Sequence, residues 1–364
     1  MEMTKTLKLR IKDKHAKVML AMARDVNQVW NFCNETQFRS LKRYFNRPKV
    51  WLTGFDLQKL TNGFSKCEGV SIGSATQQQV CEEFATSLRQ FKRVRLNWRV
   101  SNRKSSKYSL GWVPFKSRAL TYRNGQVRFN GINIGLWDSY GLSKYEFKAG
   151  SFNEDARGRW YLNISVKVQA GEKPVSSGTC AVGIDLGIKT LATYSNGRKF
   201  EPKRWYRESE TALGIAQRAN KKRRVKAIHA RISNQRKNAL HQETSRLVKE
   251  HAAIFVGNVS AKSLAKTSMA KSVLDAAWTT FRTQLKYKAL RHCVVFEEIN
   301  EAYSTQTCSC CEEFSPGSPK GRAGLGIRQW TCSMCGSEHD RDVNAARNIA
   351  RLGLQALAEG ISAL

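Results

Sequence analysis

The chain has 364 residues, enough for two or three domains that each bury a hydrophobic core. It carries 62 Lys and Arg residues against 29 Asp and Glu residues, a formal net charge of +33. This excess predicts a polyanionic partner, DNA or RNA, and disfavours a membrane. The sequence has no apolar run of about 18–20 residues that would predict a membrane-spanning helix. The N-terminal MEMTKTLKLRIKD lacks the apolar region of a signal peptide, so we expect a cytoplasmic protein.

The first half of the sequence predicts a β-sheet domain with a helical insertion. Apolar residues alternate over residues 5–11, which indicates a strand, and helical periodicity follows over 15–44 and 74–98. Short alternating runs with two Asn-Gly pairs occupy residues 111–168, a pattern typical of β-hairpins. We therefore expect an antiparallel β-barrel or sandwich that includes the first strand, with residues 15–105 inserted as helices.

The second half predicts strands that alternate with helices. Residues 169–178 read as an interdomain linker, after which a buried strand turns through Gly197 into a second strand. The further predicted elements, in chain order, are a helix over 208–251, a strand over 254–256, a helix over 271–292, a strand over 293–299 and a C-terminal helix over 343–358. This alternation is typical of a mostly parallel sheet.

Two Cys-x-x-Cys pairs predict a zinc site. In a reducing compartment ten cysteines indicate metal ligands or free thiols more than disulfides. The pairs are Cys308 with Cys311 and Cys332 with Cys335. Together they complete a tetrahedral four-sulfur site, which has no open position and is therefore structural. The alternative is four reduced thiols without metal, and Cys310 is expected to be a neighbour, not a ligand.

Carboxylates in the second half predict a magnesium site. Asp185 lies in Val-Gly-Ile-Asp-Leu-Gly, and a buried carboxylate is costly unless it is hydrogen-bonded or binds a metal. Asp340 and Asp342 precede the C-terminal helix, whose N-terminus needs one of them at most as a cap. Asp185 and Asp342 could together hold Mg²⁺, which selects carboxylates. Hydrolysis of a phosphodiester with two ions calls for a third carboxylate.

A long basic run predicts contact with phosphates. Residues 217–237 read QRANKKRRVKAIHARISNQRK, and no acidic residue occurs from Thr211 to Gln242. A solvated helix face would normally mix both signs, so an unbroken positive helix is typical of nucleic-acid binding. The candidate residues are Lys221, Lys222, Arg223, Arg224, Arg231, Arg236 and Lys237.

Several segments together resemble one protein family. GIDLG, RKNALHQETSRLVKE, LDAAWTTFRTQLKYKA, EAYSTQTCSCC and CSMCGSEHDRDVNAARNIA occur in this order. They resemble the TnpB (OrfB) proteins of bacterial insertion sequences, which are relatives of the type V CRISPR effectors. The resemblance covers nearly the whole chain and is most specific between residues 180 and 350.

The resemblance implies an α/β plus β-barrel fold in four parts. It implies an OB-like wedge barrel with a helical recognition insertion, and a RuvC-like nuclease domain of RNase-H fold with a zinc-ribbon insert that binds target nucleic acid. The expected boundaries are 1–14 and 106–170 for the wedge, 15–105 for the insertion, 179–300 and 339–364 for the nuclease domain and 301–338 for the ribbon.

The resemblance also implies an activity, partners and cofactors. The expected activity is RNA-guided cleavage of double-stranded DNA, with a guide RNA transcribed from the transposon end. Two Mg²⁺ ions would share Asp185, while Asp342 and a glutamate would each hold one ion, and Zn²⁺ would be structural. Arg341 would contact phosphate. The protein would act on the nucleoid in a bacterial cytoplasm, and the sequence leaves its oligomeric state open.

The sequence departs from the family pattern at the expected third ligand. The family glutamate should end the strand in IFVGNVSAKSL, where this chain has Gly257. The next strand, CVVFEEI, offers Glu297 and Glu298 near its C-terminal end. Adjacent strands lie about 4.8 Å apart, so either glutamate could reach across the vacated position. Side chains alternate along a strand, so only one of the two faces the metal, and Glu298 is preferred.

Three functions remain open from the sequence. The first is an active nuclease in which a relocated glutamate replaces the missing one. The second is an RNA-guided DNA-binding protein that represses without cutting. The third is a zinc-ribbon adaptor that binds nucleic acid without a guide.

Overall fold

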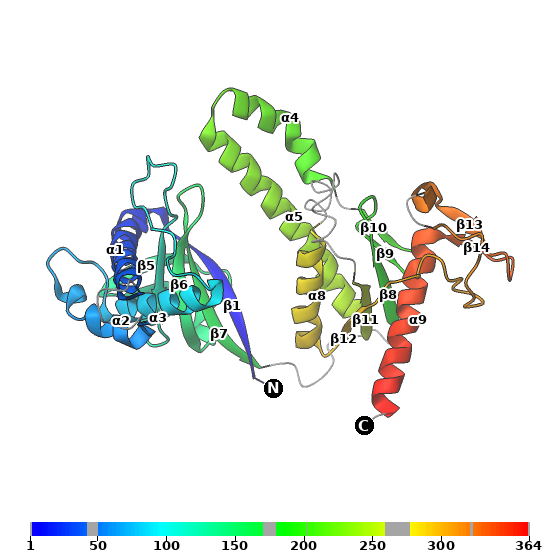
Figure 1. The fold of residues 1–364 in the computed structure, drawn as a ribbon, viewed down its shortest axis with the longest axis horizontal. Coiled ribbons are helices and arrows are strands. Elements are labelled where there is room, and N and C mark those ends of the chain that lie inside the picture. The colour runs from blue at the N-terminus through cyan, green and yellow to red at the C-terminus, as the bar shows by residue number, and fades with distance from the viewer. Residues whose placement is uncertain are drawn as a thin grey trace. The chain divides into compact units, whose positions relative to one another are not determined.

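The computed structural model describes residues 2–41, 50–169, 180–201, 203–258, 277–320 and 323–362. The chain divides into two compact units, which comprise residues 2–169 and 170–364 (Figure 1). The predicted linker, apart from its first residue, and the beginning of the helix predicted over 271–292 lie outside the described residues.

The first unit is built on a curled antiparallel sheet of seven strands. The strand order is β2-β6-β7-β1-β5-β4-β3, so the first strand of the chain lies inside the sheet. The strands are β1 (Glu2–Ile11), β2 (Trp112–Phe115), β3 (Leu120–Arg123), β4 (Gln126–Phe129), β5 (Ile132–Trp137), β6 (Phe147–Glu154) and β7 (Trp160–Gln169). Both Asn-Gly pairs form the predicted hairpin turns, because Asn124, Gly125, Asn130 and Gly131 all have positive φ angles.

Three helices pack on this sheet, namely α1 (Ala16–Leu41), α2 (Gly54–Leu60) and α3 (Ser74–Phe91). Phe115 is buried in the shared core and Trp112 packs against it. The helix predicted over 74–98 is too long. It ends at Phe91 because Lys92 adopts the left-handed conformation, and the Asn34 side chain then holds the backbone of Leu96 in a non-helical segment.

The second unit is built on a five-stranded mixed sheet of order β10-β9-β8-β11-β12. The strands are β8 (Ala181–Leu186), β9 (Ala192–Tyr194), β10 (Lys199–Phe200), β11 (Ala253–Gly257) and β12 (Val295–Ile299). β8, β11 and β12 are parallel, as predicted, whereas β9 and β10 are antiparallel. The carboxyl ends of the three parallel strands therefore meet at one edge.

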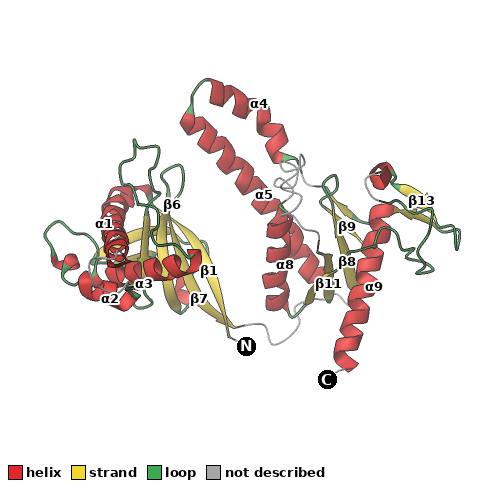
Figure 2. Cartoon of the chain, viewed as in Figure 1, coloured by secondary structure: helices red, strands yellow, loops and turns green. Residues whose placement is uncertain are grey.

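Helices cover both faces of this sheet (Figure 2). On one face, α5 (Lys222–Glu250) and α8 (Trp278–His292) pack on Val182, Ile184 and Val256. On the other face lies α9 (Arg341–Ser362), which contacts Phe255. Alternate residues of each strand thus face different helices, which decides where each carboxylate side chain points.

The long helix predicted over 208–251 is two helices. α4 (Trp205–Arg218) is followed by α5, and Asn220 between them has a φ of 50°, which breaks the helix. The insert before α9 carries two short strands, β13 (Gln329–Thr331) and β14 (Glu338–Asp340). In the described part of the chain, no helix is long and apolar enough to cross a membrane.

Candidate nuclease and zinc sites

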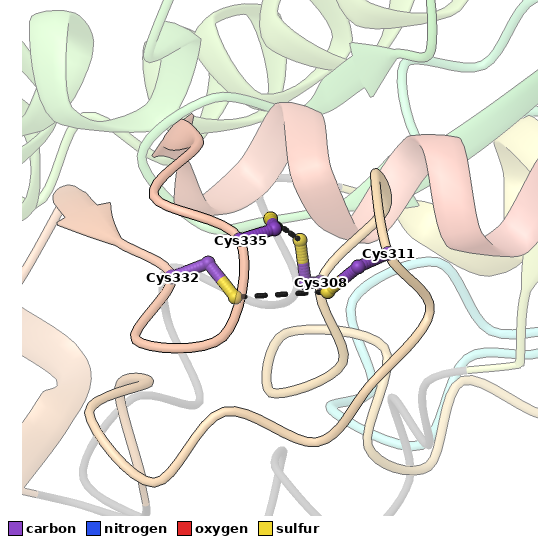
Figure 3. A group of neighbouring side chains, drawn as sticks. All are labelled: Cys308, Cys311, Cys332 and Cys335. Atoms are coloured by element: carbon purple, nitrogen blue, oxygen red, sulfur yellow. Dashed lines mark hydrogen bonds between the residues drawn. The ribbon is translucent and has the colours of Figure 1, made fainter.

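The two Cys-x-x-Cys pairs converge on one point (Figure 3). The four Sγ atoms all lie within 4.8 Å of one another, with 3.6 Å between Cys308 and Cys335 and 3.8 Å between Cys311 and Cys332. A tetrahedral zinc ion with Zn–S bonds of about 2.3 Å requires sulfur atoms about 3.8 Å apart. The described geometry therefore fits Zn²⁺.

Backbone amides favour the thiolate form of these cysteines. The Cys310 N–H donates to Cys308 Sγ and the Met334 N–H donates to Cys332 Sγ, both at 3.4 Å. The Ser337 hydroxyl lies 3.3 Å from Cys335 Sγ and lowers the pKa of that thiol to about 6. Cys310 is exposed. His339, which sequence reasoning did not assign, places Nε2 3.0 Å from Cys308 Sγ.

Two asparagines of α9 fasten the segment before Cys308 to the sheet unit. The side-chain amides of Asn344 and Asn348 each donate to the backbone carbonyls of Ser304 and Thr307. Asn344 Oδ1 also accepts from the Ser309 N–H at 2.8 Å. Both asparagines are buried, so their side chains hold the segment that leads into Cys308 in one position.

Asp185 lies near the carboxyl end of β8 and faces α9. Gly183, two residues earlier on the same face, allows α9 to lie directly on the strand, because a Cβ atom there would collide with the backbone oxygen of Ala346. α9 therefore passes close to β8. Asp342 lies in the first turn of α9, and Asp185 is the last residue of β8 that faces this helix. Two carboxylates that are far apart in sequence thus meet.

The acidic residues before α9 have separate roles. Asp340 Oδ1 accepts hydrogen bonds from the Asp342 and Val343 amides, both at 3.0 Å, and so caps the helix. Asp342 makes ion pairs with Arg341, at 3.0 Å, and with Arg328. Cap formation therefore leaves the Asp342 carboxylate available to cations.

The pKa of Asp185 reflects its burial and the charged groups near it. Burial raises the pKa of Asp185 to about 7, and the negative charges of Asp342 and Glu301 add to the rise, while Arg341 and Arg328 oppose it. Among the described residues, only the four cysteines place three or more ligand atoms within 4.8 Å. Asp185, Asp342 and Glu301 do not bring their carboxylate oxygens together within that distance.

Glu298 does not face Asp185, contrary to expectation. It pairs with Val256 in the sheet, and Val256 packs on the α8 side. Its carboxylate forms an ion pair with Arg282 of α8 at 3.2 Å. Glu297 is on the side of the sheet that faces α9. However, it pairs with Phe255, which is level with Gly183, two residues before Asp185.

Glu301 is the residue that sequence reasoning missed. It follows β12 by two residues and is one of the two carboxylates that raise the pKa of Asp185. The available signal was the two-residue side-chain period, which places residues 297, 299 and 301 on one face if the chain stays extended. The prediction from the sequence concerned only Glu297 and Glu298, which lie within the strand.

The basic run lies on the α4–α5 hairpin and is mostly exposed. Lys221, Lys222, Arg223, Arg224, Arg231 and Lys237 are exposed, and Arg236 is half-buried. These side chains belong to the connection between the helices and to the first half of α5. Arg341 differs from them because it is nearly buried against Asp342.

Comparisons with known proteins match this arrangement. The family model described as "Cas12f1-like, TNB domain" matches residues 278–349, and the model described as "Probable transposase" matches residues 163–268. A Streptomyces pristinaespiralis protein named as an RNA-guided DNA endonuclease is 33% identical over 309 residues, which cover 79% of this chain and 74% of the relative.

More distant relatives agree with that match. The Escherichia coli K12 protein InsQ, also named as an RNA-guided DNA endonuclease, is 29% identical over 231 residues, which cover 56% of each chain. Among solved structures, a Cas12f1–sgRNA–target DNA complex aligns with a TM-score of 0.57 at 12% identity, covering 96% of this chain and 99% of Cas12f1. This last similarity concerns the fold alone.

Proposed function

This chain belongs to the TnpB family of RNA-guided DNA endonucleases, and from that premise we propose that it cuts double-stranded DNA selected by a guide RNA. The observation that carries the proposal is the convergence of Asp185 and Asp342 at the carboxyl edge of the parallel strands. Ligand and catalytic sites of open α/β sheets occur at this edge.

The fold assignment proposed for the nuclease unit is a RuvC-like RNase-H domain. Three antiparallel strands followed by two parallel ones, in the order β10-β9-β8-β11-β12, support it. The curled sheet of the first unit supports an OB-like wedge, and helices α1 to α3 support a recognition insertion. The proposed boundaries are those expected from the sequence.

The residues at this edge fit Mg²⁺. Carboxylate oxygens are the ligands that Mg²⁺ prefers. At Asp342 the ion would compete with the Arg328 and Arg341 guanidinium groups. Asp185, Asp342 and a third carboxylate would hold the ions. Bound Mg²⁺ would supply the activated water and stabilise the leaving oxygen. The ion-paired Arg341 would orient Asp342 and lie near the scissile phosphate.

The remaining charged and cysteine residues would hold the partners. The exposed basic run of the α4–α5 hairpin would bind the backbone of the guide RNA or of its duplex with target DNA. The cysteine cluster would bind structural Zn²⁺ and shape a ribbon that contacts target nucleic acid. We expect the protein to act on the nucleoid in the bacterial cytoplasm.

The test is cleavage of a matched plasmid. The full chain would be produced with the DNA that flanks its gene, the copurified RNA sequenced, and a plasmid that carries its complement and a randomised flank added with Mg²⁺. We expect cutting by the wild-type complex and none by Asp185→Ala, while Asp13→Asn, an exposed carboxylate of the first unit, cuts normally.

Two other outcomes would each replace the proposal. RNA-dependent target binding without cutting would identify a DNA-binding repressor, the alternative that Gly257 raises. Absence of both copurified RNA and target-selective binding would identify an adaptor without a guide.

A further inference from the structure

The residues that border Asp185 in the sheet leave one position without a side chain. β11 pairs in parallel with β8 and with β12, and the register aligns Gly257 with Ile299 on one side. Because Val256 pairs with Ile184, Gly257 comes level with Asp185 on the other side. A side chain at position 257 would therefore project on the face of α9, next to the Asp185 carboxylate.

That space is filled by Glu301. A Cβ atom built on Gly257 would collide with Glu301 Oε2 and would lie 3.2 Å from Ile349 Cδ1. The Oε2 atom is itself buried. The Glu301 carboxylate thus occupies the position at which a side chain of residue 257 would begin. Glu301 reaches it from the neighbouring strand, because it lies two residues after the end of β12.

The backbone around Glu301 is fixed at both ends. Before it, the Asn258 N–H donates to the Ile299 carbonyl at 3.0 Å. After it, the Ser304 N–H donates to the Glu301 carbonyl at 3.1 Å. The Ser304 carbonyl in turn accepts from Asn344 and Asn348 of α9, the helix that also carries Asp342. Such fixed support is what a metal-binding side chain requires.

We propose that Glu301 supplies the third metal-binding carboxylate of the nuclease site, replacing a side chain absent at Gly257. This proposal rests on the proposed nuclease function and assigns its last ligand. Glu301 lies on the sheet face that α9 covers and at the carboxyl edge of the parallel strands. It would add the third negative charge to those of Asp185 and Asp342. Neither Glu297 nor Glu298 meets the first two conditions together.

The first experiment compares isosteric variants of the full protein–RNA complex. We expect Glu301→Gln to reduce the cleavage rate about 100-fold or more and to weaken Mn²⁺ binding, measured by titration calorimetry, at least about 10-fold. Binding of target DNA should be unchanged. The matched control is Glu297→Gln, a glutamate of the same segment and the same face, which should cut and bind Mn²⁺ as the wild type does.

The second experiment moves the carboxylate. Glu301→Ala opens the space beside Gly257. Adding Gly257→Glu then places a carboxylate beside Asp185 from strand β11 instead of from the segment after β12. We expect the double variant to regain Mn²⁺ binding and at least about 10-fold of the cleavage that Glu301→Ala loses. A folded double variant that regains neither would contradict the shared location.

The failure of this inference can be told apart from the failure of the proposed function. If the wild-type complex cuts and Glu301→Gln cuts and binds Mn²⁺ equally well, Glu301 is not a ligand and the nuclease function stands. If the wild-type complex binds its target but does not cut, the function fails. The Mn²⁺ titrations of wild type and Glu301→Gln then still decide whether Glu301 binds metal.

Discussion

Asp185 is a carboxylate that the folded protein holds in an unfavourable setting. Burial, with the nearby charges of Asp342 and Glu301, raises its pKa to about 7 from an ordinary value of 3.8. A carboxyl group whose pKa is higher in the folded state favours folding when protonated. Its contribution to stability is therefore complete below about pH 4 and is lost as the pH rises to about 7.

Asp185→Asn should stabilise the metal-free protein at neutral and higher pH. The shift of about 3 units corresponds to at most about 4 kcal/mol. In EDTA, we expect the variant to unfold at a higher temperature than wild type at pH 8, and the two to converge below about pH 3.5. Mg²⁺ should stabilise only the wild type. An equal difference at both pH values would contradict this account.

For single residues, the sequence predicts which side chains could bind a metal better than it predicts where those side chains lie in the fold. The four cysteines could be found because their spacing alone defines the geometry of a zinc site. Asp185 and Asp342 could be found because each lies at the end of a recognisable element. The two-residue period indicates Glu301 only if the chain stays extended after β12, and the turn after β12 and the space beside Gly257 are defined only by the folded chain.

Among the elements, α9 depends most on close packing. Its backbone lies against Gly183 of β8, and its Gly353 lies against the Phe255 ring of β11. These two small residues let one helix approach two adjacent strands. The sequence predicted the helix but not these contacts, because the absence of a side chain carries no hydrophobic periodicity.

Gly183→Ala should therefore destabilise the second unit. The new Cβ would meet the backbone oxygen of Ala346, which cannot move without shifting the helix, at a cost of about 1–3 kcal/mol. We expect a lower urea midpoint together with slower cleavage, since Asp342 moves with α9. Gly360→Ala, on the helix that packs against Gly183, is the control. A Cβ there meets open space, and the change should stabilise the helix slightly.

The α4–α5 hairpin should bind RNA through charge. Changing Lys222, Arg223 and Arg224 to Gln should weaken guide-RNA binding and should reduce the slope of log K against log salt by about 0.7 for each phosphate that is no longer neutralised. Filter binding at several salt concentrations measures both. Arg207→Gln with Lys249→Gln, two cations of the same hairpin outside the run, serves as the control. Equal slopes for both variants would contradict the assignment.

For the whole molecule, the order of most strands and helices followed from sequence patterns, but the breaks between helices did not. Hairpin signals, alternation of strands and helices, and the paired cysteines predicted most elements in the correct order. Asn220 in a left-handed conformation divided one predicted helix, and Lys92 ended another early. Single residues with unusual backbone angles leave too weak a signal within a strongly helical pattern.

Loss of zinc should affect the nuclease unit as well as the insert. The segment between β12 and Cys308 is shared by Glu301 and the first cysteine pair. If the wild type binds one Zn²⁺, measured by mass spectrometry, we expect Cys332→Ser to lose that ion and to abolish cutting while RNA binding persists. Cys310→Ser, an exposed cysteine of the same turn, should keep both zinc and cutting. Zinc-free protein with full cleavage would show that the two sites are independent.

The asparagine contacts of α9 also constrain how this protein can change over time. Asp342, the asparagine pair at 344 and 348, and Gly353 must each face a different neighbour from one rigid helix. Insertion of one residue after Asp342 would turn everything behind it by about 100°. That single event would detach the segment before Cys308 from α9 and would also displace the helix from the sheet. Lineages of this chain should therefore accept many substitutions on the outer face of α9 and almost no change in its length.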